Sequence, residues 1–92
     1  MKILVDTDVL VDLALDRRPH GAPAGELLDL LEEKRGIGFI AWHSASNDFE
    51  DAMQVAAALA CGAEVIATRN VRDYAGAPVR AATPASLVKL LA

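Results

Sequence analysis

The stretch ILVDTDVLVDL, residues 3–13, decides the fold because a strand pattern changes into a helix pattern at its carboxylates. Lys2 to Val5 form a short and mostly apolar run, which predicts a buried strand. Apolar residues then recur at helical spacing, so we expect a helix that begins near Thr7 or Asp8, either of which can cap it. Asp6 therefore falls at the end of a buried strand, next to the start of a helix.

Strand and helix patterns alternate along the rest of the chain. The expected strands are Ile37–Trp42, Glu64–Ala67 and Val79–Ala81. The first helix should end at residues 17–19, and three more helices are expected: a Leu-rich helix that follows a loop at residues 20–25 and is capped by Gly36, an Ala-rich helix from Asn47 to Gly62, and a last helix from Thr83 to Leu91. The order β-α-α-β-α-β-β-α predicts an α/β fold: a small parallel sheet flanked by helices, in one compact domain of residues 1–92.

Composition and charge exclude some classes of protein. Hydrophobic residues make up 53% of the 92 residues and aromatic residues only 4%, so the core must consist mainly of Ala, Val, Leu and Ile. So much apolar content in a short chain favours a homodimer or a larger oligomer. A net charge of −4 argues against nucleic-acid binding through a broad basic surface. It does not argue against a nucleic-acid enzyme whose acidic site holds metal ions.

Cysteine usage and hydropathy indicate an ordinary intracellular chain. Cys61 is the only cysteine, so no disulfide can form within one chain. The N-terminus lacks the pattern of a signal peptide, and no apolar run is long enough to span a membrane. We therefore expect a cytoplasmic protein with no membrane partner.

Acidic residues gather where the predicted sheet should have its site. In open α/β sheets, sites form beyond the carboxyl ends of the strands. Asp6 and Asp8 lie at one such end, Asn70 and Asp73 follow the third strand, and Asp51 lies in the first turn of the Ala-rich helix. Mg²⁺ and Mn²⁺ prefer oxygen ligands of this kind and can polarise a phosphoryl oxygen. The pattern predicts a divalent-cation site, provided that the strands are neighbours.

Some of these carboxylates have a simpler interpretation. Asp8, Asp12 and Asp16 are spaced four apart, so they share one face of the first helix. A solvated acidic face accounts for Asp12 and Asp16, whereas Asp8 is either a helix cap or part of the site. Asp48 is a cap or a surface acid, and Asn47 fits the first position of a capping box. Asp6 is poorly explained in these ways because it ends an apolar strand.

Two blocks of the sequence resemble a known family. ILVDTDVLVDL resembles the opening of PIN domains, and DFEDAMQVAAALACGAEVIATRNVRDY, residues 48–74, resembles their C-terminal half. TPASLVKLL, residues 83–91, resembles their closing helix. The resemblance covers nearly the whole chain, and the second block is the more specific. It implies an Mg²⁺- or Mn²⁺-dependent ribonuclease, like the toxins of VapBC-type toxin–antitoxin pairs, with RNA as substrate and an antitoxin protein as partner.

The resemblance also assigns roles to residues. It implies that Asp6 is the first acid of the metal site and that Asp51 is the acid at the head of the Ala-rich helix. The late position falls on Asn70, with Asp73 three residues further on. Thr68 matches a small hydroxyl residue found beside the site. The implied catalytic acids are therefore Asp6, Asp51 and Asp73, with Asn70 as a further metal ligand.

The two arginines near the late position have two interpretations. Arg69 and Arg72 flank the acidic residues, so they are candidates, with Thr68, for contact with the RNA substrate. The alternative is that both belong to a solvated loop.

The chain departs from PIN domains in its middle. Between Asn47 and Asp48 the resemblance implies the loss of a helical pair and an edge strand. The second acid of the family, usually Glu, has no counterpart, and Asn47 is the nearest residue. The remaining strands should keep the family-like order 2-1-3-4, and the surface left open should be covered by another subunit.

Other functions remain open at this point. Asp6-Thr7-Asp8 resembles the Asp-x-Asp signature of haloacid-dehalogenase-like phosphatases, in which one Asp is a nucleophile. Val9 stands where Gly is usual, and no later acidic pair follows a strand. A receiver domain would need a lysine after a late strand, which is not evident. The third alternative is a shortened PIN-like module that binds a partner but has lost RNA cleavage.

Overall fold

One parallel sheet organises the chain. The computed structural model describes residues 1–16, 18–40 and 47–92, and of residues 47–53 only the backbone. The strands of the described chain are β1 (Lys2–Val5), β2 (Ile37–Ile40), β3 (Val65–Ala67) and β4 (Arg80–Ala82). They form a four-stranded sheet in the order β2-β1-β3-β4, and every neighbouring pair is parallel. The expected α/β class and the strand order 2-1-3-4 are confirmed.

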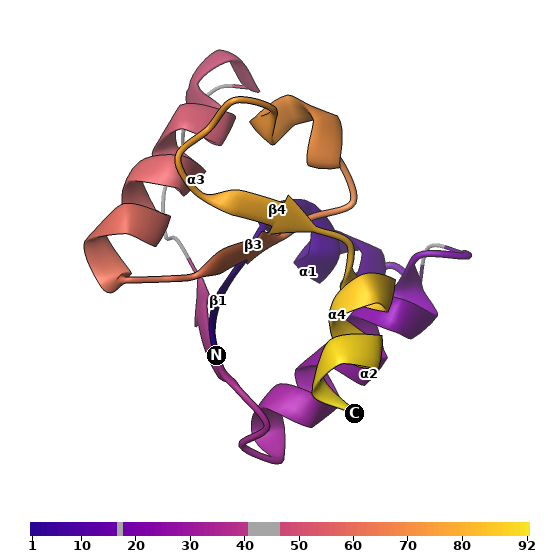
Figure 1. Cartoon of the computed structure of the whole chain (residues 1–92). Helices are drawn as coiled ribbons and strands as arrows, with labels where there is room; N and C mark the ends of the chain where they lie inside the picture. Colours follow the sequence, from indigo (N-terminus) through magenta and orange to yellow (C-terminus); the bar gives the residue numbers. More distant parts are fainter. Residues whose placement is uncertain (17, 41–46) are drawn as a thin grey trace.

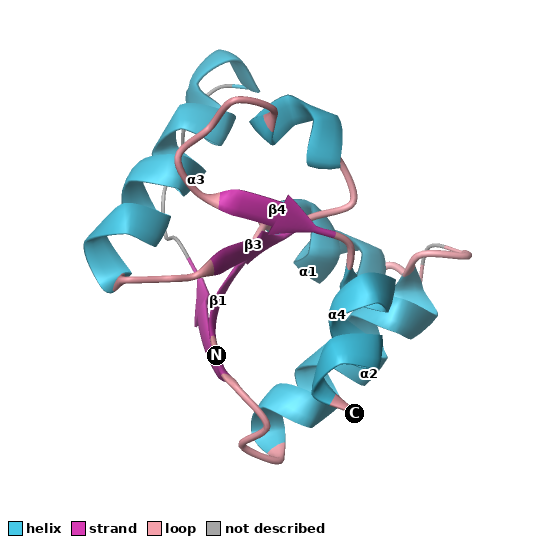
Figure 2. Cartoon of the chain, viewed as in Figure 1, coloured by secondary structure: helices cyan, strands magenta, loops and turns pink. Residues whose placement is uncertain are grey.

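Helices cover both faces of this sheet (Figure 1). The helices of the described chain are α1 (Thr7–Ala14), α2 (Gly21–Glu32), α3 (Asn47–Cys61), the 3₁₀ helix η1 (Val71–Tyr74) and α4 (Pro84–Leu91). Figure 2 shows α1, α2 and α4 together on one side of the strands, and α3 on the other. The sheet therefore lies between two layers of helix, as parallel strands require when both of their faces are apolar.

The alternation of side chains along the strands creates two separate apolar clusters. Ile3 and Val5 of β1 pack with Val9 of α1, Leu27 of α2 and Leu87 of α4, all of them fully buried. The intervening strand residues point to the opposite face, where Leu4, Ile66, Ala58 and Tyr74 form the second cluster beneath α3 and η1. Each buried Leu, Ile or Val side chain contributes about 1.5–3 kcal/mol relative to exposure. These clusters fix the position of β1 and hence of Asp6.

The predicted loop at residues 20–25 is wrong, because α2 already begins at Gly21. Pro23 is compatible with this, since the N–H groups of a first helical turn have no intrahelical partner. The glycines serve close packing: a Cβ on Gly21 would lie 3.1 Å from the backbone oxygen of Asp12. A Cβ on Gly25 would lie 3.4 Å from Leu13 Cδ1. Residues that suggested a loop therefore form the contact between α1 and α2.

The predicted cap at Gly36 is also wrong. Helix α2 ends at Glu32, and Lys34 adopts the left-handed conformation with a φ of 65°. Gly36 is needed for another reason, since a Cβ there would lie 3.1 Å from the backbone oxygen of Met1. The first helix likewise stops earlier than expected, at Ala14, and Asp16 has a positive φ of 48°.

The other boundaries are close to those expected. Strand β2 ends at Ile40, and the rest of the expected strand lies outside the described residues. Strand β4 begins one residue late, because Val79 packs into the cluster under α3 before the strand starts. The cap of α4 is confirmed: Thr83 Oγ1 accepts a hydrogen bond from the backbone N–H of Ser86, at 3.2 Å. None of the described helices is long and apolar enough to cross a membrane.

Candidate metal centre

Asp6 lies at the carboxyl end of β1 and is 4% exposed. Its backbone N–H bonds the carbonyl oxygen of Ala67, which ties it to the end of β3. Three side chains donate to its carboxylate. Gln54 Nε2 reaches Oδ1 at 3.2 Å, while the hydroxyls of Thr68 and Tyr74 both reach Oδ2 at 2.9 Å. Hydrogen bonds of this kind stabilise a buried carboxylate, which would otherwise be costly.

Thr68 connects the two carboxylates. It follows β3 directly and is fully buried. Its Oγ1 lies 2.9 Å from Asp6 Oδ2 and 3.3 Å from Asp8 Oδ2, and the backbone N–H of Asn70 donates to it at 3.1 Å. A hydroxyl has one proton, so it donates to one carboxylate at a time, and the shorter contact is with Asp6. Thr68 therefore links both carboxylates to the end of β3.

Asp8 points to this site and does not cap α1. The N-cap of α1 is Asp6, and it makes no side-chain capping bond. Asp8 Oδ2 accepts a hydrogen bond from Asn70 Nδ2 at 2.8 Å. Asp8 Oδ1 is buried and has no hydrogen-bond partner among the described residues. An acceptor in that state costs free energy unless something else, such as a cation or a water, fills the position.

Burial raises the pKa of Asp8 from 3.8 to about 6, and the neighbouring charge of Asp6 acts in the same direction. Hydrogen bonds from the backbone of Arg69 and the hydroxyl of Thr68 lower the pKa of Asp8, but they offset only part of this rise. Burial and the charge of Asp6 thus disfavour the ionised form of Asp8, and positive charge nearby would favour it. A divalent cation between the two carboxylates would supply that charge.

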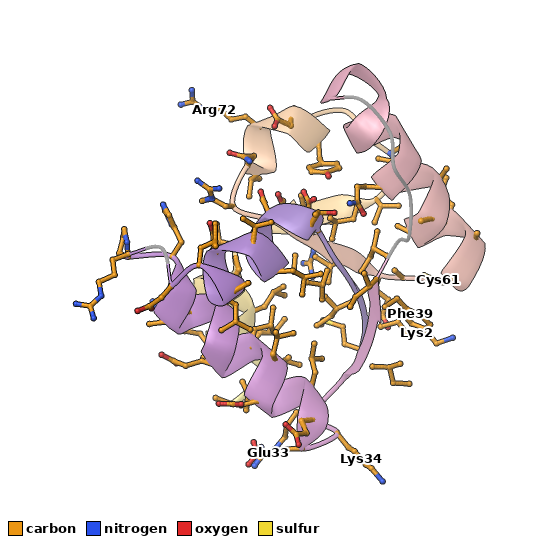
Figure 3. All side chains as sticks on the ribbon, turned by 180° about the vertical axis from the view of Figure 1, so that it is seen from behind. Lys2, Glu33, Lys34, Phe39, Cys61 and Arg72 are labelled. Carbon is orange, nitrogen blue, oxygen red and sulfur yellow. The ribbon has the colours of Figure 1, made fainter. Side chains whose placement is uncertain are left out.

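The segment after β3 brings some predicted residues to the site and leaves others outside. Asn70 joins Asp8, as described above. Asp73 is exposed on η1, and among the described residues no hydrogen bond or ion pair joins its side chain to Asp6 or Asp8. Arg72 is exposed too and extends away from the molecule (Figure 3). The two acids and the amide at the site therefore come from β1, α1 and the start of the loop after β3.

Three predicted residues belong to the segment described by its backbone only. Asn47, Asp48 and Asp51 lie in the first part of α3, and their side chains are outside the described part of the structure. The backbone places position 51 three residues before Gln54, so both positions share one face of α3. Gln54 contacts Asp6. Among the described side chains of α3, Gln54 is the one that reaches the acid pair.

Asp12 and Arg69 correct the sequence interpretation. Asp12 is not a surface residue, since it is 2% exposed, and its Oδ2 lies 3.0 Å from Arg69 Nε. Asp16, in contrast, is exposed as expected. Helical spacing placed the two acids on one face but could not reveal that Arg69, far along the chain, covers Asp12. Arg69 is thereby held by a carboxylate, with its side chain about one-third exposed.

The acid pair can hold a divalent cation in a limited way. A carboxylate has about four positions for donors or metals, and Asp6 uses three of them for hydrogen bonds. Within the part of the chain whose side chains are described, Asp8 Oδ1 has no partner and Asp6 Oδ1 accepts only from Gln54, so both can still bind a cation. The residues described by side chain contain no group of three or more His, Cys, Asp or Glu that could hold a metal. Mg²⁺ commonly needs only one or two carboxylates besides waters and phosphate oxygens, so the donors fit this ion.

Comparisons of the chain with protein-family models, with curated protein sequences and with solved structures found no match.

Two residues of the site escaped the sequence analysis. Gln54 is fully buried and is followed by apolar residues as far as the end of α3, and Tyr74 is 4% exposed at the end of η1. A signal existed for Gln54, because a lone Gln among apolar residues of a buried helix requires a polar partner. Tyr74 carried the weaker signal, since a Tyr that packs in a core usually finds a partner for its hydroxyl.

Proposed function

We propose that the chain is a PIN-like, Mg²⁺- or Mn²⁺-dependent ribonuclease that hydrolyses RNA phosphodiester bonds in the cytoplasm. The observation that carries the proposal is the acid pair at the carboxyl ends of β1 and β3. Asp6 and Asp8 share the hydroxyl of Thr68, and one buried oxygen of Asp8 has no hydrogen-bond partner among the described residues. The parallel sheet in the order 2-1-3-4 is compatible with this family but does not by itself imply its activity.

The described residues have distinct tasks in this proposal. Asp6 and Asp8 are the metal ligands, with Asp51 from the head of α3 as the third acid. Thr68 and Asn70 orient Asp8, while Gln54 and Tyr74 hold Asp6 in place. When bound, a divalent cation polarises a phosphoryl oxygen and activates a water for attack. Without a bound cation, the negative charges of Asp6 and Asp8 would repel each other and would also repel the phosphodiester.

Asp73 has a secondary role in this scheme. Its exposed position on η1 suits contact with a second cation at the rim better than a place among the central ligands. Arg72, exposed on the same short helix, can approach RNA phosphates. Arg69 is partly engaged by Asp12, so less of its charge is left for phosphate.

Exposed apolar residues support the proposal of a homodimer or larger oligomer. Strand β2 is at the edge of the sheet, and Ile37 and Ile40 on it are 54% and 58% exposed. An open apolar edge strand invites pairing with another chain. A second copy, or an antitoxin protein, would cover it. A clean monomer in light scattering at micromolar concentration would contradict the oligomer.

The decisive experiment is cleavage of single-stranded RNA in the presence of Mn²⁺ or Mg²⁺. We expect activity that EDTA abolishes and that Asp6→Asn and Asp51→Asn each reduce by about a hundredfold or more, as for loss of a group essential to transition-state stabilisation. Asp29→Asn, which changes an exposed acid of α2, is the matched control and should keep full activity. Activity that survives both Asp6→Asn and Asp51→Asn would refute the metal-nuclease assignment.

One observation favours a second function, a PIN-like binding module that has lost cleavage. Three donors among the described residues already occupy Asp6, and the second acid of the family has no counterpart in this chain. Calorimetry separates the two functions. Binding of Mn²⁺ that is lost in Asp6→Asn supports the nuclease, whereas no binding by the native chain favours the module. The phosphatase alternative is weakened, because a buried Asp6 with three donors is a poor nucleophile.

A further inference from the structure

A cavity of about 250 Å³ opens beside Asp12 and Arg69. Its walls come from four parts of the chain: Asp12 of α1, the start of α2 with Pro23, Arg69 after β3, and the first turn of α4 with Pro84 and Ala85. Pockets that hold drug-sized ligands have volumes of roughly 300–1,000 Å³, so this cavity suits a smaller group. It is separate from the acid pair, because neither Asp6 nor Asp8 lines it.

Two of the residues that line the cavity, Asp12 and Arg69, form an ion pair that is incompletely satisfied. Asp12 is 2% exposed, and its Oδ2 lies 3.0 Å from Arg69 Nε. Its other oxygen, Oδ1, is buried without a hydrogen-bond partner among the described residues, and Arg69 Nε makes the ion pair without hydrogen-bond alignment. Unsatisfied buried polar atoms of this kind call for an explanation. A small rotation of the Asp12 carboxylate, whose terminal torsion is broad, would present an acceptor to a ligand.

Most of the surface that lines the cavity is apolar, although Thr83 also borders it. Pro23 and Pro84 face it from two helices, Ala85 adds a methyl group, and the exposed His20 lies at its edge. Rigid rings of this type suit a planar partner that needs one polar edge and two apolar faces. Asp12 offers an acceptor and Arg69 a donor to the polar edge. A nucleobase has this combination of a flat apolar body and an edge with adjacent donor and acceptor atoms.

The position of the cavity connects it to the acid pair. Asp12 follows Asp8 by one helical turn of α1, which rises about 5.4 Å. Arg69 lies between Thr68 and Asn70, both of which contact Asp8. A nucleotide whose phosphate reached the acid pair could therefore place a neighbouring base at the cavity. Because the chain has a net charge of −4, affinity for RNA cannot come from a basic surface, and contacts to bases must supply more of it.

We propose that this cavity binds one unpaired nucleobase of the RNA next to the phosphodiester bond that is cut. Asp12 accepts a hydrogen bond from an N–H of the base, Arg69 donates to the adjacent acceptor, and the base lies against Pro23 and Pro84. The assignment of the ligand to RNA rests on the proposed ribonuclease function. Binding of the base itself does not require cleavage or metal.

The test is NMR titration of the ¹⁵N-labelled full chain without divalent metal. The probes are adenosine and cytidine monophosphate, ribose 5-phosphate and a short single-stranded oligoribonucleotide. We expect the nucleotides to shift the amide signals of Asp12, Arg69 and Ala85, and ribose 5-phosphate to leave them unchanged. Equal shifts with ribose 5-phosphate would show recognition of phosphate and overturn the proposal. An oligonucleotide that bound no more tightly than a mononucleotide would overturn the assignment to RNA.

Variants locate the binding. Ala85→Leu fills the mouth of the cavity from an exposed position, so folding is preserved, and it should weaken nucleotide binding about tenfold or more. Ala60→Leu makes the same change at an exposed position of α3 and should have no effect. Unchanged binding in Ala85→Leu would refute the proposed site.

Asp6→Asn separates this inference from the proposed function. It should abolish cleavage and keep nucleotide binding, since Asp6 does not line the cavity. A chain that binds nucleotides but never cuts RNA would refute only the nuclease. A chain that cuts RNA without shifts at the cavity would refute only the base site.

Discussion

Gln54 Nε2 donates a hydrogen bond to Asp6 Oδ1 at 3.2 Å, across 48 residues of sequence. The same amide lies 3.3 Å from Thr7 Oγ1, at the start of α1. Gln54 is fully buried and its Oε1 has no hydrogen-bond partner among the described residues. The contact joins α3 to the junction of β1 and α1, so the two helical layers on opposite faces of the sheet meet at this carboxylate.

Replacement of Gln54 tests this link. Gln54→Met keeps the length of the side chain and removes the donor, so we expect a loss of about 1–2 kcal/mol in the free energy of unfolding. Gln54→Glu places a second carboxylate beside Asp6 and should cost about 3 kcal/mol at pH 8. Since burial near a like charge favours the protonated form of the new acid, its cost should shrink as the pH falls to 5. Urea denaturation at both pH values measures these changes, and equal stability of Gln54→Glu and the native chain at pH 8 would contradict the link.

Thr68 offers a second test, because its hydroxyl contacts both acids. Thr68→Val has nearly the same shape but leaves Asp6 Oδ2 with one donor fewer and removes the acceptor for the Asn70 N–H. We expect a loss of about 2 kcal/mol in the free energy of unfolding, the scale of a hydrogen bond to a charged group. Thr68→Ser keeps the hydroxyl and is the control, which should retain most of this stability. Equal losses in the two variants would assign the effect to packing.

The raised pKa of Asp8 predicts a dependence of stability on pH. The carboxyl binds its proton more tightly in the folded chain, with a pKa of about 6, than at the ordinary value of 3.8. The contribution of Asp8 to the free energy of unfolding is therefore fully present below pH 3.8 and is lost as the pH rises through 6. A shift of this size corresponds to at most about 3 kcal/mol, which solvent screening at a half-buried group reduces to about 1 kcal/mol.

Asp8→Asn removes this titration and keeps an acceptor for Asn70. In metal-free buffer, the native chain should lose about 0.5 kcal/mol more than the variant between pH 5 and pH 7.5, because this window covers about half of the titration. Guanidinium denaturation at the two pH values measures the difference. Parallel curves for the two chains would show that Asp8 does not titrate in this range.

The sheet and part of the site could be predicted because they depend on local patterns. The apolar run before Asp6 identified β1, and parallel strands place their carboxyl ends at one edge. That rule brings Asp6, Thr68 and Asn70 together, as the structure shows. The cap at Thr83 also follows from local chemistry alone.

The remaining features depend on tertiary packing. Gln54 reaches Asp6 only because of the rotation of α3 on the sheet, which an Ala-rich sequence does not specify. Asp12 is spaced like a surface acid, but Arg69 covers it from the loop after β3. Gly21 and Gly25 suggested a loop because glycine is common there, whereas both lie in α2, and the missing side chain of Gly21 lets α2 approach α1 closely.

These two glycines differ in how closely they pack, which leads to opposite predictions. A Cβ on Gly21 would lie 3.1 Å from the backbone oxygen of Asp12, which cannot move without shifting α1. Gly21→Ala should therefore lower the free energy of unfolding by about 1–2 kcal/mol. A Cβ on Gly25 would make an ordinary contact with Leu13 Cδ1, at 3.4 Å. Since alanine favours the helix interior, Gly25→Ala should raise the free energy of unfolding by about 0.5–1 kcal/mol.

Thermal unfolding of the two variants beside the native chain tests whether α2 begins where the structure places it. If residues 20–25 formed a loop, neither alanine would meet α1 and neither would extend a helix. Both variants would then unfold at nearly the same temperature as the native chain. A lower midpoint for Gly21→Ala together with a higher one for Gly25→Ala requires both the helix and its close contact with Asp12, the residue that holds Arg69 beside the acid pair.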